Sequence, residues 1–354
     1  MTQTRPPQGR IHSLDALRGL AALAVAWFHI THGGKLLAES SSPFLQAAAW
    51  MGSLGYHGVT LFFVLSGFVI PLSMQRTSRG SGLRAALQGF PRFLLPRLVR
   101  LWPPFVVASM LAIGLNLLSA AVPGYRGQFQ VTPFQAGSSL LTDSLFLTGL
   151  LGGSWILVVA WTLALEVQFY VIAGLVEPTS TSARMHHPWP TLFVGLISVS
   201  VLAWLLPWPA LVFGALPAFT LGWVSAHQLL APHRCQWLGI AWLLVLIALR
   251  SGMDHAAASA LCAALIALAV RFPNRAPLPL LWLGGISYSL FLIHVPIGGR
   301  VVNLGGRLSL DTPQNCLLCL ASLALSLAVA WWFARCIERP SHAWSRKLSE
   351  SLNP

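Results

Sequence analysis

The stretch that decides the fold is LDALRGLAALAVAWFHI, residues 14–30. With its flanks it is apolar enough and long enough to form a helix that crosses a lipid bilayer. It nevertheless carries three ionisable side chains, Asp15, Arg18 and His29. At 100° per residue they fall within about 60° of one another on one helix face. Gly19, Ala22 and Ala26 lie on or beside this face, so another backbone is expected to approach closely there. A charge at the bilayer centre costs from about 3 to more than 10 kcal/mol, so this face is expected to point at protein or at a wet cavity.

The rest of the chain has a membrane protein's composition. Of 354 residues, 55% are hydrophobic and 9% charged, whereas soluble domains carry about 25% charged residues. Apolar runs of roughly 20 residues recur, which predicts an all-α polytopic membrane bundle of about ten transmembrane helices. The stretch 139–151 is too short to cross and is expected to be interfacial or re-entrant. The expected spans are 14–32, 57–75, 98–122, 154–176, 190–207, 209–229, 236–253, 255–272, 280–300 and 314–337.

The basic residues indicate the orientation. Lys and Arg outnumber Asp and Glu by 22 to 9, but they lie between apolar spans, so they report topology and do not indicate nucleic acid. With the N-terminus inside, 16 of them fall on the cytoplasmic side and 5 outside. This is the positive-inside bias, and it predicts an N-in and C-in protein. Cys316 and Cys319 form a CxxC without a second pair or a nearby histidine, so no metal site is expected there.

His29 admits two interpretations. It lies about 21 Å along the helix from Asp15, at 1.5 Å per residue, so it needs a separate explanation. It is either an interfacial histidine bonded to a backbone carbonyl or a general base, since imidazole titrates near neutrality. Asp15 and Arg18, three residues apart, form either a local ion pair or part of a site.

Glu166 is a second ionisable residue deep in a span, within WTLALEVQFY (residues 161–170). It is expected to be functional or to have a cationic partner. Counted from Ser154, it lies about 18 Å below the outer face. It is then deeper than His29, so the two are not obvious partners unless the span is broken or shifted.

The stretch RFLLPRLVRLWPP (residues 92–104) is the densest basic patch. Positive-inside topology explains two or three of its charges. Arginine is also suited to holding phosphates with two hydrogen bonds at once. Both a membrane surface and a phosphate-rich ligand therefore fit Arg97 and Arg100.

Six motifs follow one another along the chain: RIHSLDALRGLAALAVAWFH (10–29), GVTLFFVLSGFVI (58–70), RLVRLWP (97–103), WTLALEVQFY (161–170), ISYSLFLIHVPI (286–297) and IERP (337–340). In this order they resemble the motifs of the acyltransferase family 3 membrane proteins. The resemblance implies one membrane domain over residues 10–340, without a separate extracytoplasmic domain. Thr60 departs from the family at a position where an acidic or other polar residue is frequent, and Phe291 departs where tyrosine is common. Either departure is expected to affect acceptor choice more than chemistry.

The resemblance implies a membrane O-acyltransferase in the inner membrane of a bacterium. It would move an acyl group, most simply acetyl, from acyl-CoA to a hydroxyl of a cell-envelope or secreted carbohydrate or glycolipid. The coenzyme would be a donor substrate, with no permanently bound cofactor. The implied catalytic residues are His29 and Glu166. The implied donor-binding residues are Arg97, Arg100, Arg10 and Arg18, and the implied supporting or substrate-binding residues are Asp15, Ser66, Trp161, Tyr170, Tyr288 and His294.

Two other functions fit parts of this pattern. A transporter or flippase would use the intramembrane Asp, Glu and His as a proton relay, but such proteins usually show internal repeats, and the sequence has no such symmetry. An acyltransferase acting on a small natural product, such as a macrolide, would share the chemistry and differ in the acceptor.

Overall fold

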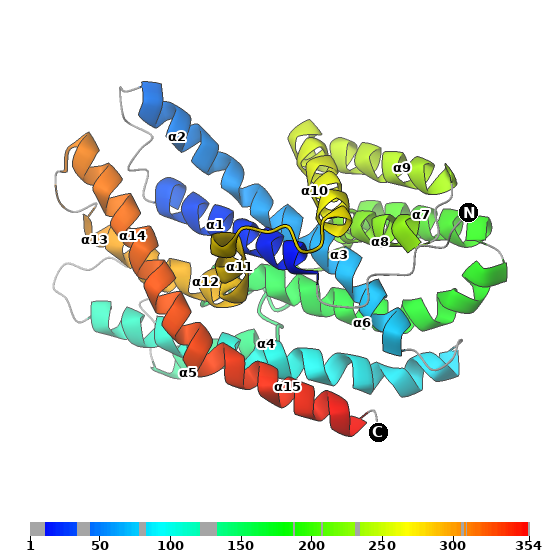
Figure 1. Cartoon of the computed structure of the whole chain (residues 1–354). Coiled ribbons are helices and arrows are strands. Elements are labelled where there is room, and N and C mark those ends of the chain that lie inside the picture. Colours follow the sequence, from blue (N-terminus) through cyan, green and yellow to red (C-terminus); the bar gives the residue numbers. More distant parts are fainter. Residues whose placement is uncertain are drawn as a thin grey trace.

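The structure, a computed structural model, describes residues 11–33, 43–77, 83–120, 133–186, 188–206, 208–230, 234–305, 308 and 310–352. Within these ranges the chain is helical and contains no strand, which confirms the all-α prediction (Figure 1). The first half consists of α1 (His12–Gly33), α2 (Pro43–Ser53), η1 (Leu54–Tyr56), α3 (His57–Thr77), α4 (Leu83–Ala120), α5 (Pro133–Ser144) and α6 (Ala160–His186). The second half consists of α7 (Pro188–Leu205), η2 (Val212–Gly214), α8 (Leu216–Leu230), α9 (Arg234–Ser251), α10 (Met253–Arg271), α11 (Leu278–Gly285), α12 (Ser287–His294), η3 (Val295–Gly299), α13 (Arg300–Gly305), α14 (Thr312–Phe333), η4 (Ala334–Glu338) and α15 (Arg339–Leu352).

The described helices include several that can cross a membrane. By length and composition there are five, or six if the bent pair α11 and α12–α13 forms one span. Three further apolar helices are shorter. The chain is therefore a multi-pass membrane protein, while the number of ten spans and the side of each terminus stay predictions. The five helices cover His12–His32, Leu45–Met74, Ala86–Ala120, Met253–Arg271 and Thr312–Leu352.

Two of the expected spans are interrupted. The span expected over 154–176 becomes helical only at Ala160, because Asp143 holds the preceding segment in turns by accepting a hydrogen bond from the backbone N–H of Ile156 (2.9 Å). The span expected over 280–300 bends by 63° between α11 and α12. Beyond α12 the chain makes a π-helical turn that contains Pro296, where the missing N–H interrupts regular α-helical bonding.

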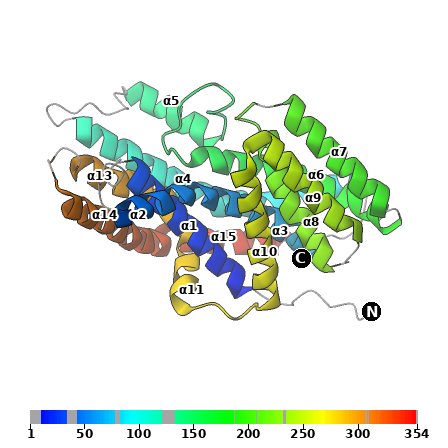
Figure 2. The same cartoon turned by 90° about the horizontal axis from the view of Figure 1, so that it is seen from above.

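The centre of the bundle is α1, which packs against α3 on one side and α11 and α12 on the other (Figures 1 and 2). A Cβ atom at Gly19 would lie 2.6 Å from the backbone nitrogen of Gly284, so the two backbones touch there. Ala22 and Ala26, farther along the same face, are fully buried. The close approach of a second backbone, expected from these small residues, is confirmed.

The long helix α4 lies beside both α6 and α15 (Figure 1). It runs for 38 residues despite four internal prolines. A hydrogen bond from the Ser345 hydroxyl of α15 to the carbonyl of Pro96 (2.6 Å) joins it to the end of the chain. The basic motif on α4 is thereby held next to both α6, which carries Glu166, and α15.

Candidate active site

His29 lies on α1, half-buried, with one ring nitrogen in contact with two acceptors. Its Nδ1 is 3.0 Å from the carbonyl oxygen of Val25 and 3.2 Å from Nε2 of His294. A carbonyl oxygen only accepts hydrogen bonds, so Nδ1 of His29 carries the proton. The unprotonated nitrogen of the neutral ring is then Nε2, which is the one able to take up a proton.

His294 supports this assignment from α12. It is completely buried, and its Nδ1 lies 2.9 Å from the carbonyl oxygen of Leu290. By the same reasoning its Nδ1 donates to that carbonyl, which leaves Nε2 with the lone pair that accepts from His29. His294 is therefore a neutral ring with its proton on Nδ1, and it orients His29 through this contact.

A pocket of about 350 Å³ opens beside His29. Apolar residues form most of its wall, and the exposed indole of Trp161 is part of it. Thr60 and Phe291, the two departures from the family motifs, both line it. Both departures therefore change the wall of the space beside His29.

Polar residues that the sequence motifs did not single out border the same pocket. Arg250, in the last turn of α9, and His255, in the first turn of α10, line it together with Tyr56. The Tyr56 hydroxyl donates to the carboxylate of Asp254 (2.7 Å), and the ring of His57 lies 5.1 Å from that of His255. The sequence pointed to this group only through His57, at the start of the span expected over 57–75. A histidine at the end of a span is too common to indicate a site.

Glu166 has its partners elsewhere. Its Oε1 accepts hydrogen bonds from the Ser66 hydroxyl on α3 (2.9 Å) and from the Tyr170 hydroxyl one turn along α6 (2.6 Å). Arg18 on α1 interacts with it electrostatically. The structure thus brings Ser66, Tyr170 and Glu166 together, as a group separate from the His29–His294 pair.

Arg18 and Arg97 both interact electrostatically with this carboxylate, and Arg100 interacts with both of these arginines. We call Arg18, Arg97, Arg100 and Glu166 the arginine cluster. Arg97 donates to the Phe93 carbonyl (2.7 Å) and to the Ser73 hydroxyl (2.6 Å), so two of its donors are already used. Arg100 is exposed, and its charge acts on both Arg18 and Arg97. The cluster therefore presents one exposed guanidinium backed by two partly buried ones.

The remaining predicted residues fall around these two centres. Asp15 interacts electrostatically with Arg18, in keeping with the local ion pair considered above. The Tyr288 hydroxyl donates to the carbonyl of Leu101 on α4 (2.8 Å), next to Arg100. Arg10 lies outside the residues that the structure describes.

The two centres lie at different levels of α1. Arg18 and His29 are eleven residues apart, which is about 16 Å along the helix axis. The sequence grouped His29 and Glu166 as catalytic residues, but the structure does not place them in contact. The later start of α6 does not bring Glu166 and His29 together. Glu166 accepts from side chains on α3 and α6, whereas His29 contacts His294 on α12.

Asp143 shapes the approach to the pocket. It is fully buried and accepts hydrogen bonds from the Ile156 backbone N–H (2.9 Å) and from the Thr148 hydroxyl. Burial raises the pKa of its carboxyl above the ordinary value. This side chain holds the turns that lead into α6 and so places Trp161 and Thr162 on the pocket wall.

A family model described as an acyltransferase domain matches residues 11–335. This range holds both histidines, the pocket and the arginine cluster. No curated protein and no solved structure matches the chain. Over nearly its whole length, the chain belongs to acyltransferase family 3 and is a membrane acyltransferase.

Proposed function

We propose that the protein is an O-acyltransferase of a bacterial inner membrane that moves an acetyl group from acetyl-CoA to a hydroxyl of a cell-envelope or secreted carbohydrate. The observation that carries the proposal is the pair of contacts made by Nδ1 of His29. Its Nδ1–H is committed to Val25 and His294, and its ring borders a pocket large enough for reacting groups. A histidine held in this way is ready to act as a general base through Nε2.

The reaction needs one proton carrier and no further reagent. The acceptor oxygen attacks the thioester carbonyl while Nε2 of His29 takes the hydroxyl proton. The tetrahedral intermediate collapses, the carbon–sulfur bond breaks, and the imidazolium returns the proton to the departing thiolate. The products are an O-acyl ester and free coenzyme A, and His29 is again neutral. His294 orients the ring throughout and does not exchange the proton itself.

The donor enters this scheme from the arginine cluster. Phosphates of the coenzyme are expected to bind Arg100, because this guanidinium is exposed. Arg97 and Arg18 add positive charge behind it, and Glu166 orders the surrounding hydroxyls. The pantetheine arm would span the distance of about 16 Å along α1 between the two levels. The membrane orientation predicted above makes the arginine cluster cytoplasmic and His29 outer.

The acceptor is expected in the pocket beside His29. Tyr56, Thr60 and His255 line it with groups that hydrogen-bond to hydroxyls, and Trp161 offers an apolar surface. This mixture suits a sugar, which has both polar edges and apolar faces. The carbohydrate acceptor itself is inferred from the family resemblance.

The test compares cells that carry the parental chain with cells that carry His29→Ala. Mass spectrometry of cell-envelope glycans and secreted metabolites should detect O-acetyl esters only with the parental chain. His32→Ala is the matched control, because His32 lies on the same helix, is exposed and does not itself line the pocket. An unchanged ester profile in His29→Ala cells with normal membrane insertion would contradict the proposal.

A further inference from the structure

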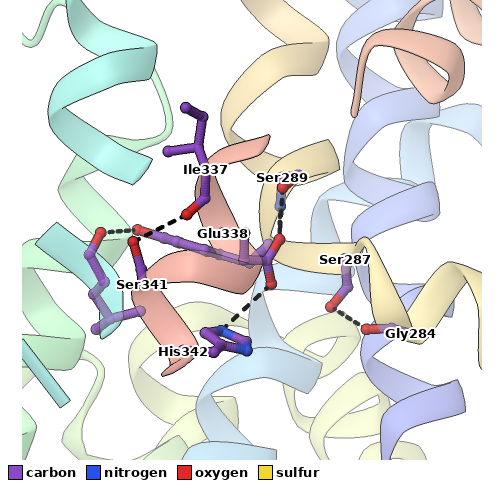
Figure 3. A network of polar contacts seen from close by, with 9 residues as sticks. Gly284, Ser287, Ser289, Ile337, Glu338, Ser341 and His342 are labelled. Atoms are coloured by element: carbon purple, nitrogen blue, oxygen red, sulfur yellow. Dashed lines mark hydrogen bonds and ion pairs between the residues drawn. The ribbon is translucent and has the colours of Figure 1, made fainter. Parts of the chain in front are cut away.

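Glu338 is a buried carboxylate for which the reaction above has no use. It is 5% exposed and lies in η4, the π-helical turn where α14 passes into α15. Its Oε2 accepts from the Ser289 hydroxyl (2.5 Å) and from the Ser289 backbone N–H (3.2 Å). Its Oε1 lies 3.6 Å from Nε2 of His342 (Figure 3). Burying an ionised group in this way is costly unless its hydrogen bonds are met.

The partner of Glu338 belongs to the helix that orients the catalytic base. Ser289 lies in the first turn of α12, and His294 lies in its last turn. The backbone N–H groups of a first turn have no partner within the helix. The side chain of the N-cap residue Ile286 does not accept from them. Glu338 instead accepts from the N–H of Ser289 and so caps α12 from another part of the chain (Figure 3).

The backbone departs from regular α-helix at both ends of this connection. Glu338 closes one π-helical turn, and another, η3, begins directly after His294. Such turns shift side chains around the helix axis and occur frequently at functional sites. Ser289, Leu290 and His294 are buried, so α12 has little room to rotate once Ser289 is fixed.

We infer that Glu338 is a positioning residue for His29, acting through α12 and His294. The inference rests on the proposed function, because it assigns a purpose to the orientation of His29. By holding Ser289, Glu338 fixes the rotation of α12 and with it the place of the His294 Nε2 lone pair. Loss of Glu338 is expected to lower kcat by no more than loss of the His294 acceptor does, about 2- to 13-fold.

Glu338 also interacts electrostatically with Arg100, and this supplies a second readout. Removal of a carboxylate near Arg100 takes away a charge that repels phosphate, so coenzyme A affinity should not fall. A variant that is merely misfolded would instead lose affinity and rate together. A lower kcat with an unweakened Kd for coenzyme A therefore separates positioning from damage to the fold.

The experiment is a double-mutant cycle on the full chain in lipid nanodiscs. Transfer from radiolabelled acetyl-CoA to an envelope extract is measured at saturating donor, and the Kd of coenzyme A is measured separately. Glu338→Ala should lower kcat in the parental background and have no further effect in a His294→Leu background. Glu338→Gln, which keeps an acceptor for Ser289, should restore most of the rate.

Ser341→Ala is the matched control, because Ser341 is a buried neighbour on α15 whose hydroxyl donates to the Ile337 carbonyl (3.1 Å) one turn back in η4. It should leave kcat at the parental value. An equal loss from Glu338→Ala in both backgrounds, or no loss in either, would overturn the inference. If His29→Ala keeps the parental rate, the proposed function fails instead, whatever Glu338 does.

Discussion

Replacement of His294 by leucine tests how the structure prepares His29. Leucine fills a similar volume but offers no acceptor to the Nδ1–H of His29. The carbonyl of Val25, 3.0 Å away, still accepts that hydrogen, so the tautomer is retained and only one of two acceptors is lost. A neutral hydrogen bond of this kind contributes about 0.5–1.5 kcal/mol. At about 1.4 kcal/mol for each factor of ten, kcat should fall about 2- to 13-fold.

The same reasoning predicts an order among the variants. His29→Ala removes the base itself and should lower kcat about 10²- to 10⁴-fold, much more than His294→Leu. His294→Gln, whose amide oxygen is able to accept from His29, should recover part of the loss. The assay is transfer from radiolabelled acetyl-CoA to an envelope extract, with the Kd of coenzyme A as a check on folding.

Two results would refute this reasoning. If His294→Leu costs as much as His29→Ala while coenzyme A still binds, His294 takes the proton and the assignment of Nε2 of His29 is wrong. If His294→Leu has the parental rate, the contact between the two rings contributes nothing to the reaction. Either result would leave the geometry intact and change its interpretation.

Three further predictions concern the donor site and the wall of the pocket. Arg100→Ala should raise the KM for acetyl-CoA about 10- to 100-fold, the range for charge-assisted hydrogen bonds. Arg92 is an exposed neighbour on α4, and Arg92→Ala should leave this KM unchanged. Equal KM values for the two variants would exclude the phosphate role of Arg100. Glu166→Gln keeps an acceptor for its two hydroxyl partners and should hold kcat within about tenfold of the parental value; a loss as large as that of His29→Ala would show that this carboxylate is catalytic. Asp143→Ala removes the acceptor of the Ile156 backbone N–H and should destabilise the fold by about 1–3 kcal/mol in thermal unfolding. Asp143→Asn, which keeps an acceptor oxygen, should destabilise the fold less than Asp143→Ala. Because burial raises the pKa of Asp143, the parental protein should gain stability relative to the Asn variant as the pH falls through that raised pKa. An Asn variant as unstable as the Ala variant at neutral pH would contradict this.

Local sequence properties were sufficient for the class of fold. Long apolar runs have few ways to satisfy their backbone groups in lipid other than by forming helices, so an all-α membrane protein follows from composition alone. The stripe of Gly19, Ala22 and Ala26 likewise predicted a close helix contact, because small side chains at helical spacing allow a second backbone to approach. His29 was identified as a candidate because a polar side chain on this buried face needs either a hydrogen-bond partner or a catalytic function.

Hydropathy and helical periodicity did not predict where the helices are interrupted. Hydropathy measures how apolar a segment is, and the segments 154–176 and 280–300 remain apolar through their breaks. The first break depends on a bond between Asp143 and Ile156, thirteen residues apart. The second follows α11 directly, where Gly284 touches the backbone of α1, a contact between distant parts of the chain.

Only the tertiary structure decided which polar residues are partners. The sequence contains His29, Glu166, His294 and Glu338, but helical periodicity relates residues only within one helix. The contact of His29 with His294 joins positions 265 residues apart, and that of Ser289 with Glu338 joins positions 49 apart. Such contacts are set by how whole helices pack and bend, and for that reason the sequence determined the kind of chemistry while the fold determined which side chains carry it out together.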